Sequence, residues 1–350
     1  MIVHRLIRFV APITFAIAVN GCADTTAPLP PAEEVVLIVN STEATLSIIP
    51  VDAPSSAVKV PLGGTSPTPV GVSARGEVAL VPLGLDNSVA VVNLKTATVS
   101  RTIQLPANSG ATGSAFVNDT FAYVGNPNLN TVTRINYLTG DTATVAVGVF
   151  PQGLSYTRGR LFVVNGNLVN FAPAGASWIT VIDPVTNLKS TGIDSIALTG
   201  SGNASFADVG SDGLLYVMNT GDYTSGQGRL SIVDPVARTE LASFAGFGTG
   251  PGNVAADATS DHLFVSSYTE GVMEFDMPTR TVLKGAGAGI AIPLNAAVVV
   301  DSKGRVYALD TGPCAGGVAG TLHVLRPDLT QSSTIPTGEC PVGGAVTLVP

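Results

Sequence analysis

Short apolar runs recur along the chain, and several of them end in an asparagine. The clearest copies are LIVN (37–40), YVGN (123–126), FVVN (162–165) and YVMN (216–219), and LVPL, FVSS and YALD are weaker copies. The seven copies begin at residues 37, 80, 123, 162, 216, 264 and 307, which gives spacings of 43, 43, 39, 54, 48 and 43 residues. A period slightly above forty is the length of a four-stranded propeller blade. The pattern predicts seven such blades.

Two further strands are expected after each copy. WITVIDP (178–184) and RLSIVDP (229–235) illustrate the first of them. Asp183 and Asp234 end these two strands, where an aspartate can accept bonds from backbone amides and the following proline presets a turn. A less regular strand, such as VSRTIQL (99–105), comes next, as expected at the outer edge of a blade.

The fourth strand of each blade is predicted to be short and to lie at the axis. It should follow a Pro-x-Gly or Pro-x-Asn turn, as in PQG (151–153) and PGN (251–253). The small residues of GLSY and NVAA suit this crowded position, because large side chains would collide there.

The two ends of the repeat region complement each other. EEVVLIVN (33–40) lacks an inner strand before it, and GGAVTLVP (343–350) is an inner strand without the rest of its blade. Pairing them would place residues 346–349 beside 35–39 and close the ring, leaving no sheet edge open. We therefore predict an all-β domain over residues 33–350, a seven-bladed β-propeller of four-stranded blades.

The composition agrees with this architecture. Hydrophobic residues make up 45% of the chain and charged residues 12%, with 39 glycines and 24 prolines. Such a balance suits many short strands joined by turns better than long surface helices.

YVMN, YVGN and FVVN, followed by VIDPVTN or IVDPVAR, resemble the YVTN-type β-propeller repeat of bacterial and archaeal secreted or surface proteins. The resemblance covers about residues 33–350 and implies a propeller outside the cytoplasm. It implies no activity, because the repeated residues build blades. The copies at residues 80 and 264 lack the asparagine, so no ring of seven equivalent asparagines is expected.

The first 32 residues are predicted to direct export and attachment. Two arginines precede an eleven-residue apolar run, Phe9–Val19, which as a helix would rise about 16 Å and is too short to span a bilayer. Residues 1–21 therefore fit a signal peptide. Val19 to Cys22 resembles the bacterial lipobox, which implies a lipidated Cys22 and a Pro-rich tether over 22–32. An ordinary signal peptide with a free Cys22 is the alternative.

These N-terminal features imply an exported lipoprotein on a bacterial membrane, facing the periplasm or the cell exterior. The net charge is −8, and loss of the signal peptide would leave 15 basic against 25 acidic residues. Such an acidic surface repels phosphate backbones, so nucleic acid is not an expected partner.

Cys314 and Cys340 are predicted to form a disulfide. Strands in a blade alternate in direction, so the loop after the YVxN strand and the loop before the inner strand open on the same face. Cys314 lies in the first kind of loop and Cys340 in the second. An exported protein meets an oxidising compartment, which favours the bond. A metal site lacks a nearby histidine or third cysteine, and a redox pair would need a C-x-x-C spacing.

The same face should carry the two long insertions, at residues 165–177 and 219–228. Loops on a rigid scaffold are common binding sites. The candidate ligand-binding residues are Phe171, Trp178, Asp222, Tyr223 and Gln227. In the alternative interpretation Trp178 begins a strand and packs between blades, and the long loops are insertions that the fold tolerates and that bind nothing.

Catalytic chemistry has little support in the sequence. His262 and His323 are the only histidines after the signal peptide, and each falls in a strand of a different blade. Asp208, Asp257 and Asp301 end inner strands, where turn capping is the favoured role over a calcium site. We expect no catalytic residue, no metal ligand and no cofactor.

The sequence thus favours a non-catalytic binding or scaffolding module for a protein, peptide or glycan. The alternatives are a lactonase-like or quinoprotein-like propeller enzyme and a structural component of the envelope or surface layer.

Overall fold

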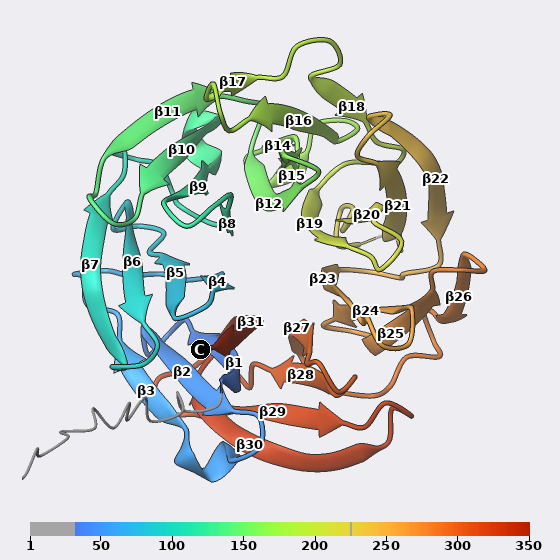
Figure 1. Cartoon of the computed structure of the whole chain (residues 1–350). Helices are drawn as coiled ribbons and strands as arrows, with labels where there is room; N and C mark the ends of the chain where they lie inside the picture. Colours follow the sequence, from blue (N-terminus) through green and yellow to red (C-terminus); the bar gives the residue numbers. More distant parts are fainter. Residues whose placement is uncertain (1–31, 225) are drawn as a thin grey trace, which may run out of the picture. The chain divides into compact units, whose positions relative to one another are not determined.

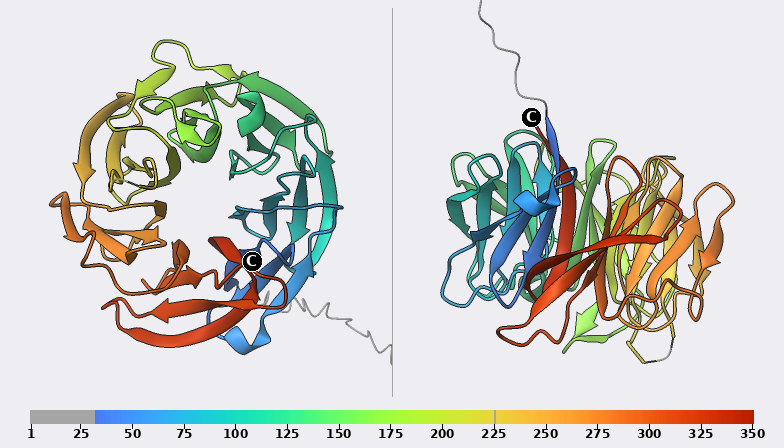
Figure 2. Two further views of the ribbon diagram at one scale, coloured as in Figure 1. Left: turned by 180° about the vertical axis from the view of Figure 1, so that it is seen from behind. Right: turned by 90° about the horizontal axis from the view of Figure 1, so that it is seen from below.

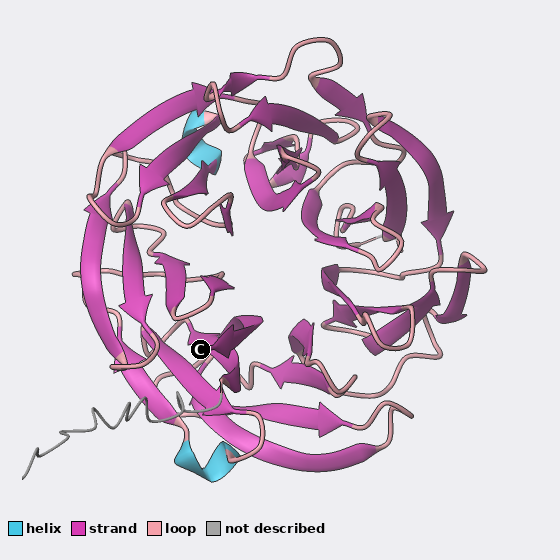
Figure 3. Ribbon diagram, viewed as in Figure 1, coloured by secondary structure: helices cyan, strands magenta, loops and turns pink. Residues whose placement is uncertain are grey.

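Seven β-sheets form a closed ring in the computed structural model, which describes residues 32–224 and 226–350 (Figure 1). The helical elements of this part are two single 3-10 turns, η1 (Pro54–Ser56) and η2 (Pro127–Leu129), shown in Figure 3. The predicted all-β, seven-bladed propeller is confirmed. The predicted signal peptide, Cys22 and the tether up to residue 31 lie outside the described residues. Within them, no helix is long and apolar enough to cross a membrane.

In blades 2 to 7 the strands run in sequence order from the axis outward. Blade 2 contains β4 (Ser73–Arg75), β5 (Val78–Pro82), β6 (Ser88–Asn93) and β7 (Thr98–Gln104); blade 3 contains β8 (Ser114–Phe116), β9 (Phe121–Asn126), β10 (Thr131–Asn136) and β11 (Thr142–Ala146). Blade 4 contains β12 (Pro151–Thr157), β13 (Arg160–Asn165) and β16 (Trp178–Asp183), with an outer strand split into β17 (Leu188–Lys189) and β18 (Ser195–Ala197).

The remaining blades follow the same plan. Blade 5 contains β19 (Ala204–Val209), β20 (Leu215–Asn219), β21 (Arg229–Asp234) and β22 (Thr239–Ala245); blade 6 contains β23 (Pro251–Ala256), β24 (His262–Ser267), β25 (Gly271–Asp276) and β26 (Thr281–Lys284). Blade 7 contains β27 (Asn295–Val300), β28 (Val306–Asp310), β29 (Ala319–Leu325) and β30 (Gln331–Glu339).

Blade 1 closes the ring with strands from both ends of the repeat region. It contains β31 (Pro341–Val349), β1 (Glu33–Asn40), β2 (Thr45–Pro50) and β3 (Val58–Pro61). β31 pairs antiparallel with β1, with Val36 opposite Val346, as the sequence predicted.

The apolar runs are nearly continuous because the strands are buried on both faces. Along β1, Val35, Leu37 and Val39 pack against blade 2, whereas Val36 and Ile38 pack against blade 7. Side chains of a strand alternate between its two faces, so each junction between blades receives every second residue. Seven apolar clusters fill the seven junctions of the described ring.

The recurring asparagine fastens the end of the second strand to the third. Asn40 Nδ2 donates to Thr45 Oγ1 and Ser47 Oγ, both at 2.9 Å, and Asn40 Oδ1 accepts a bond from Gly338 N. In blade 4 Asn165 Oδ1 accepts an equivalent bond from the amide three residues before the inner strand. The asparagine is therefore a structural residue of the blade.

The predicted Pro-x-Gly or Pro-x-Asn turn before the inner strand is wrong in three blades. Pro151, Pro251 and Pro341 are the first residues of their inner strands, and Pro151 pairs with Asn165. In blades 4 and 6 a register shift, a β-bulge, follows the proline before the ladder resumes. Proline fits the first residue of a strand because it has no N–H for the ladder.

Candidate functional site

The long insertions share one face of the ring. Antiparallel strands send successive loops to opposite faces, and the small hairpin β14 (Leu168–Val169) and β15 (Ala172–Pro173) projects on the side away from the C-terminus (Figure 2, right). We call this side the insertion face; it carries the loops after β13, β20 and β28 and the connections into the inner strands.

A disulfide joins Cys314 to Cys340 on the insertion face, as predicted. Cys314 is exposed in the loop after β28, and Cys340 is buried just before β31, where its carbonyl accepts a bond from Ser41 N. The bridge therefore ties blade 7 to the ring closure in blade 1. A disulfide is consistent with an extracytoplasmic location.

Phe171 stands at the tip of the blade 4 hairpin with 76% of its surface exposed. Its ring packs edge-on against Phe150, with centroids 5.8 Å apart. Both residues have positive φ, 62° for Phe171 and 55° for Phe150. Bulky side chains rarely adopt this left-handed conformation, and such strain concentrates at ligand-contacting segments.

Trp178 differs from the other predicted site residues because it is packed into its blade. It begins β16, pairs with Asn165 and Ala197, and is only partly exposed. A Cβ atom added to Gly148 would lie 2.6 Å from the indole ring, so the ring fills the space against the connection between blades 3 and 4. Its position matches the alternative reading, in which Trp178 begins a strand.

The blade 5 loop presents the remaining predicted residues. Tyr223 is 57% exposed with φ 64°, and its ring lies 3.6 Å from where a Cβ of Gly250 would be. Asp222 Oδ1 accepts a bond from Thr224 N within the turn. Gln227 is partly buried and packs over Gly221.

Tyr268 on blade 6 extends this aromatic surface and was missed by sequence reasoning. It is 48% exposed in the short turn after β24. Its turn is joined to the blade 5 loop through Thr249, whose carbonyl accepts a bond from Thr269 Oγ1 and whose Oγ1 accepts one from Gly226 N. Its loop has ordinary length, so a search restricted to long insertions could not find it.

A small cavity of about 190 Å³ opens beside the blade 5 loop. Ser201, Gln227, Arg229 and Ala245 line it together with two glycines. Ser201 Oγ and Gln227 Oε1 are buried and have no hydrogen-bond partner among the described residues. Arg229 is held in place by Ser243, which accepts bonds from Nε at 3.0 Å and Nη2 at 3.2 Å.

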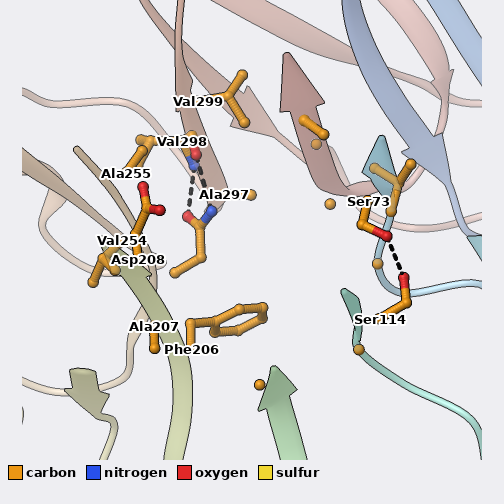
Figure 4. Close-up of a pocket in the computed structure, with 18 of the residues that line it drawn as sticks. Ser73, Ser114, Phe206, Ala207, Asp208, Val254, Ala255, Ala297, Val298 and Val299 are labelled. Atoms are coloured by element: carbon orange, nitrogen blue, oxygen red, sulfur yellow. Dashed lines mark hydrogen bonds between the residues drawn. The ribbon is translucent and has the colours of Figure 1, made fainter. Parts of the chain in front are cut away.

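The inner strands of all seven blades surround an axial channel of about 590 Å³ (Figure 4). Most lining side chains are small or aliphatic, and Phe206 is the large exception, with 41% of its surface exposed. Polar side chains on the wall link neighbouring blades. Ser73 and Ser114 share a 2.7 Å hydrogen bond, and Asn253 bonds both the N–H and the carbonyl of Val298.

Asp208 lies on the wall of the axial channel, and its predicted role as a turn cap is wrong. It belongs to β19, and its Oδ2 accepts a 2.9 Å bond from Ala256 N of the next blade. Burial raises the pKa of Asp208, and bonds from backbone amides oppose this effect. Asp257 and Asp301 do cap turns, by accepting bonds from backbone amides two residues ahead.

Asp208 is the one titratable side chain among the described residues that line the channel. Within residues 32–224 and 226–350, no three His, Cys, Asp or Glu side chains gather in a way that could hold a metal ion.

No protein-family model matches the chain, and no curated protein matches it. Among solved structures, the hydrazine synthase of Kuenenia stuttgartiensis superposes with a TM-score of 0.64 at 16% sequence identity, over 82% of this chain and 96% of the compared chain. At this identity the likeness shows the propeller fold alone. The resemblance to YVTN-type repeats stays a prediction.

Together these positions define one aromatic and polar surface. Phe171, Tyr223 and Gln227 lie on the insertion face as predicted, and Tyr268 and the cavity beside Arg229 join them. An exposed aromatic ring can stack on a ligand.

Proposed function

We propose that this protein is a non-catalytic binding module, anchored by a lipid on Cys22 outside the cytoplasm, that takes a protein, peptide or glycan on its insertion face. One observation carries the proposal. Aromatic side chains of three consecutive blades, Phe171, Tyr223 and Tyr268, are 76%, 57% and 48% exposed on the same face. Exposed aromatic residues gathered on a rigid scaffold are typical of interaction sites.

The direction of β1 supports an outward-facing role. Glu33 begins β1 on the face opposite to the insertion face, and Asn40 ends it beside the loops of the insertion face. The chain therefore enters the described ring on the face opposite to the exposed aromatic residues. The disulfide and the resemblance to YVTN-type repeats both support a location outside the cytoplasm.

The axial channel suits an enzyme less well. A lactonase-like or quinoprotein-like enzyme needs several converging polar groups at the reacting atoms. The described lining of the channel offers Asp208 and a few side chains that are already bonded between blades.

A pull-down with matched variants tests the proposal. The chain from residue 22, with Cys22→Ser, is immobilised and exposed to solubilised envelope extract, and captured material is quantified by mass spectrometry. Phe171→Ala, Tyr223→Ala and Tyr268→Ala combined should lower capture at least about tenfold, because central aromatic residues dominate binding energy.

The control combines Val185→Ala and Val236→Ala, which remove exposed apolar side chains from turns on the opposite face, 88% and 72% exposed. This variant should capture as much as the wild type. Equal losses in both variants, or no loss in the aromatic one, would refute the insertion face as the binding surface.

A further inference from the structure

We propose that the axial channel is a second binding site, for a small amine whose ammonium group pairs with Asp208 and whose apolar body packs on Phe206. This inference goes beyond the proposed function, because it concerns the axis of the ring and a different class of ligand.

The axial channel has the size and the lining of a small-molecule site. Its volume of about 590 Å³ lies within the range of about 300 to 1,000 Å³ that is usual for ligand pockets. Valine and alanine are its most frequent lining residues. Such pockets hold the apolar body of a ligand against their walls, and a few polar groups fix its orientation.

Phe206 shows that a ligand can reach the wall of the channel. It belongs to β19, the inner strand of blade 5, and yet 41% of its surface is exposed. In Figure 4 its ring extends from β19 into the space between the inner strands. An aromatic ring with this much exposed surface offers an apolar face on which a small molecule can pack.

Asp208 lies on the same side of β19 as Phe206. Side chains two residues apart in a strand point to one side, about 6.6 Å from each other along the chain. The ladder of β19 has no register shift between Phe206 and Val209, so this rule holds here. Asp208 lines the channel and is partly exposed. A molecule that packs on the Phe206 ring can therefore reach Asp208 with a group a few bonds away.

The carboxyl group of Asp208 has no basic partner among the described residues. Its Oδ1 accepts a 2.8 Å bond from Val209 N and its Oδ2 a 2.9 Å bond from Ala256 N, whereas every ion pair in the described part of the chain uses another carboxylate. Burial raises the pKa of Asp208, as expected where no cation compensates the charge. Each carboxylate oxygen can accept a second hydrogen bond, so an ammonium group can supply the missing charge.

The other polar side chains of the wall are already paired within the protein, which leaves Asp208 to select the ligand. Ser205 Oγ shares a 2.9 Å bond with Thr220 Oγ1, and Gln152 Nε2 donates to Asn203 Oδ1 at 3.1 Å. A negatively charged ligand would be repelled by the carboxylate, and a neutral apolar one would cover it without replacing its water. A positively charged amine with an apolar body avoids both penalties.

Isothermal titration calorimetry with two matched probes tests the inference. The chain from residue 22 with Cys22→Ser is titrated with n-hexylammonium chloride and with 1-hexanol, which share an apolar chain and differ in charge. Hexylammonium should bind with a Kd below about 1 mM, and hexanol at least about tenfold more weakly. Asp208→Asn should remove this preference by weakening the amine about tenfold. Phe206→Ala should weaken both probes about fivefold, because it removes apolar contact area.

Two control variants change the same chemistry outside the channel. Asp119→Asn neutralises a carboxylate whose side chain is 86% exposed, and Phe171→Ala removes an exposed ring from the insertion face. Both should bind hexylammonium as the wild type does. Thermal unfolding of each variant checks that the ring is intact.

The remaining outcomes overturn the inference. If hexylammonium does not bind, or if it binds no more tightly than hexanol, the channel is not an amine site. If Asp208→Asn leaves the preference unchanged, or Phe171→Ala weakens the amine as much as Phe206→Ala does, the site is wrongly assigned. None of these results bears on capture by the insertion face, so the proposed function is tested separately.

Discussion

Blades 1 and 5 share one four-stranded plan but treat the asparagine at the end of their second strand differently. Asn40 in blade 1 makes three side-chain hydrogen bonds, to Thr45, Ser47 and Gly338. Asn219 in blade 5 donates one bond to Ser231, and its Oδ1 has no partner among the described residues. The same residue therefore reinforces the ring in one blade and is left partly unsatisfied in the other.

The difference follows from what each blade has to hold together. Blade 1 joins the two ends of the repeat region, and the β1–β31 ladder and the bond from Gly338 N to Asn40 oppose opening of the ring. Blade 5 lies inside a continuous stretch of chain, and its neighbours hold it on both sides through apolar clusters. It can therefore lose a polar contact at small cost.

Deletion of residues 341–350 should have the largest effect on this comparison. Loss of β31 exposes the whole edge of β1 and removes Val342 and Val349 from the junction with blade 2. We expect a loss comparable to the whole stability of a domain, about 5–15 kcal/mol. The variant should show no cooperative urea transition by circular dichroism, and a normal transition would contradict ring closure as the basis of cooperativity.

Replacement of both disulfide cysteines should have the next largest effect. Cys314 and Cys340 are 26 residues apart, and closing such a loop stabilises by about 3.5 kcal/mol on the chain-entropy model. Cys314→Ser with Cys340→Ser should lower the free energy of unfolding by about this amount in urea titration. The wild type under reducing conditions should match the variant, and an unchanged midpoint would contradict a role of the bridge in closure.

Asn40→Ala and Asn219→Ala form a matched pair that tests the comparison directly. Asn40→Ala removes three hydrogen bonds and leaves Gly338 N without its partner. We therefore expect the free energy of unfolding to fall by about 3 kcal/mol. Asn219→Ala removes one bond together with a buried acceptor that has no partner, so we expect about 1 kcal/mol or less. Urea denaturation measures both. Equal losses would show that the two blades do not differ in this respect.

The smallest effect should be the pH dependence that Asp208 gives to blade 5. Burial raises the pKa of Asp208 above its ordinary value of 3.8, so the folded state binds its proton more tightly than the unfolded state. Its contribution to stability is complete below pH 3.8 and is lost as the pH rises through the folded pKa. Relative to Asp208→Asn, the wild type should lose stability between acidic and neutral pH in thermal unfolding. Parallel curves would contradict the raised pKa.

The sequence predicted the blades well because their pattern is local. A strand buried on both faces needs an unbroken apolar run, and the spacing of the runs counts the blades. The Cys314–Cys340 pairing could also be predicted, because the alternating direction of the strands places both loops on one face. The predicted turn was wrong because the sequence pattern is the same for a proline that precedes the inner strand and for one that is its first residue.

The site was only partly predictable, and particular residues show why. Trp178 was grouped with the insertion residues because it adjoins them in sequence, but pairing with Asn165 and Ala197 packs it into the sheet. Asp208 resembled Asp257 and Asp301 in position, yet it lies within its strand and bonds Ala256 of the next blade. Tyr268 has no local signal, since only the ring brings its turn beside the blade 5 loop, where Thr249 bonds both Thr269 and Gly226.

The sequence by itself determined the repeat, the number of blades, the closing strand and the cysteine pair, because each depends on residues within one unit of about forty or on the strict alternation of strands. Only the tertiary structure decided which side chains share the insertion face and where a cavity opens between them. Those contacts join residues of different blades, so the spacing of the repeat carries no signal for them.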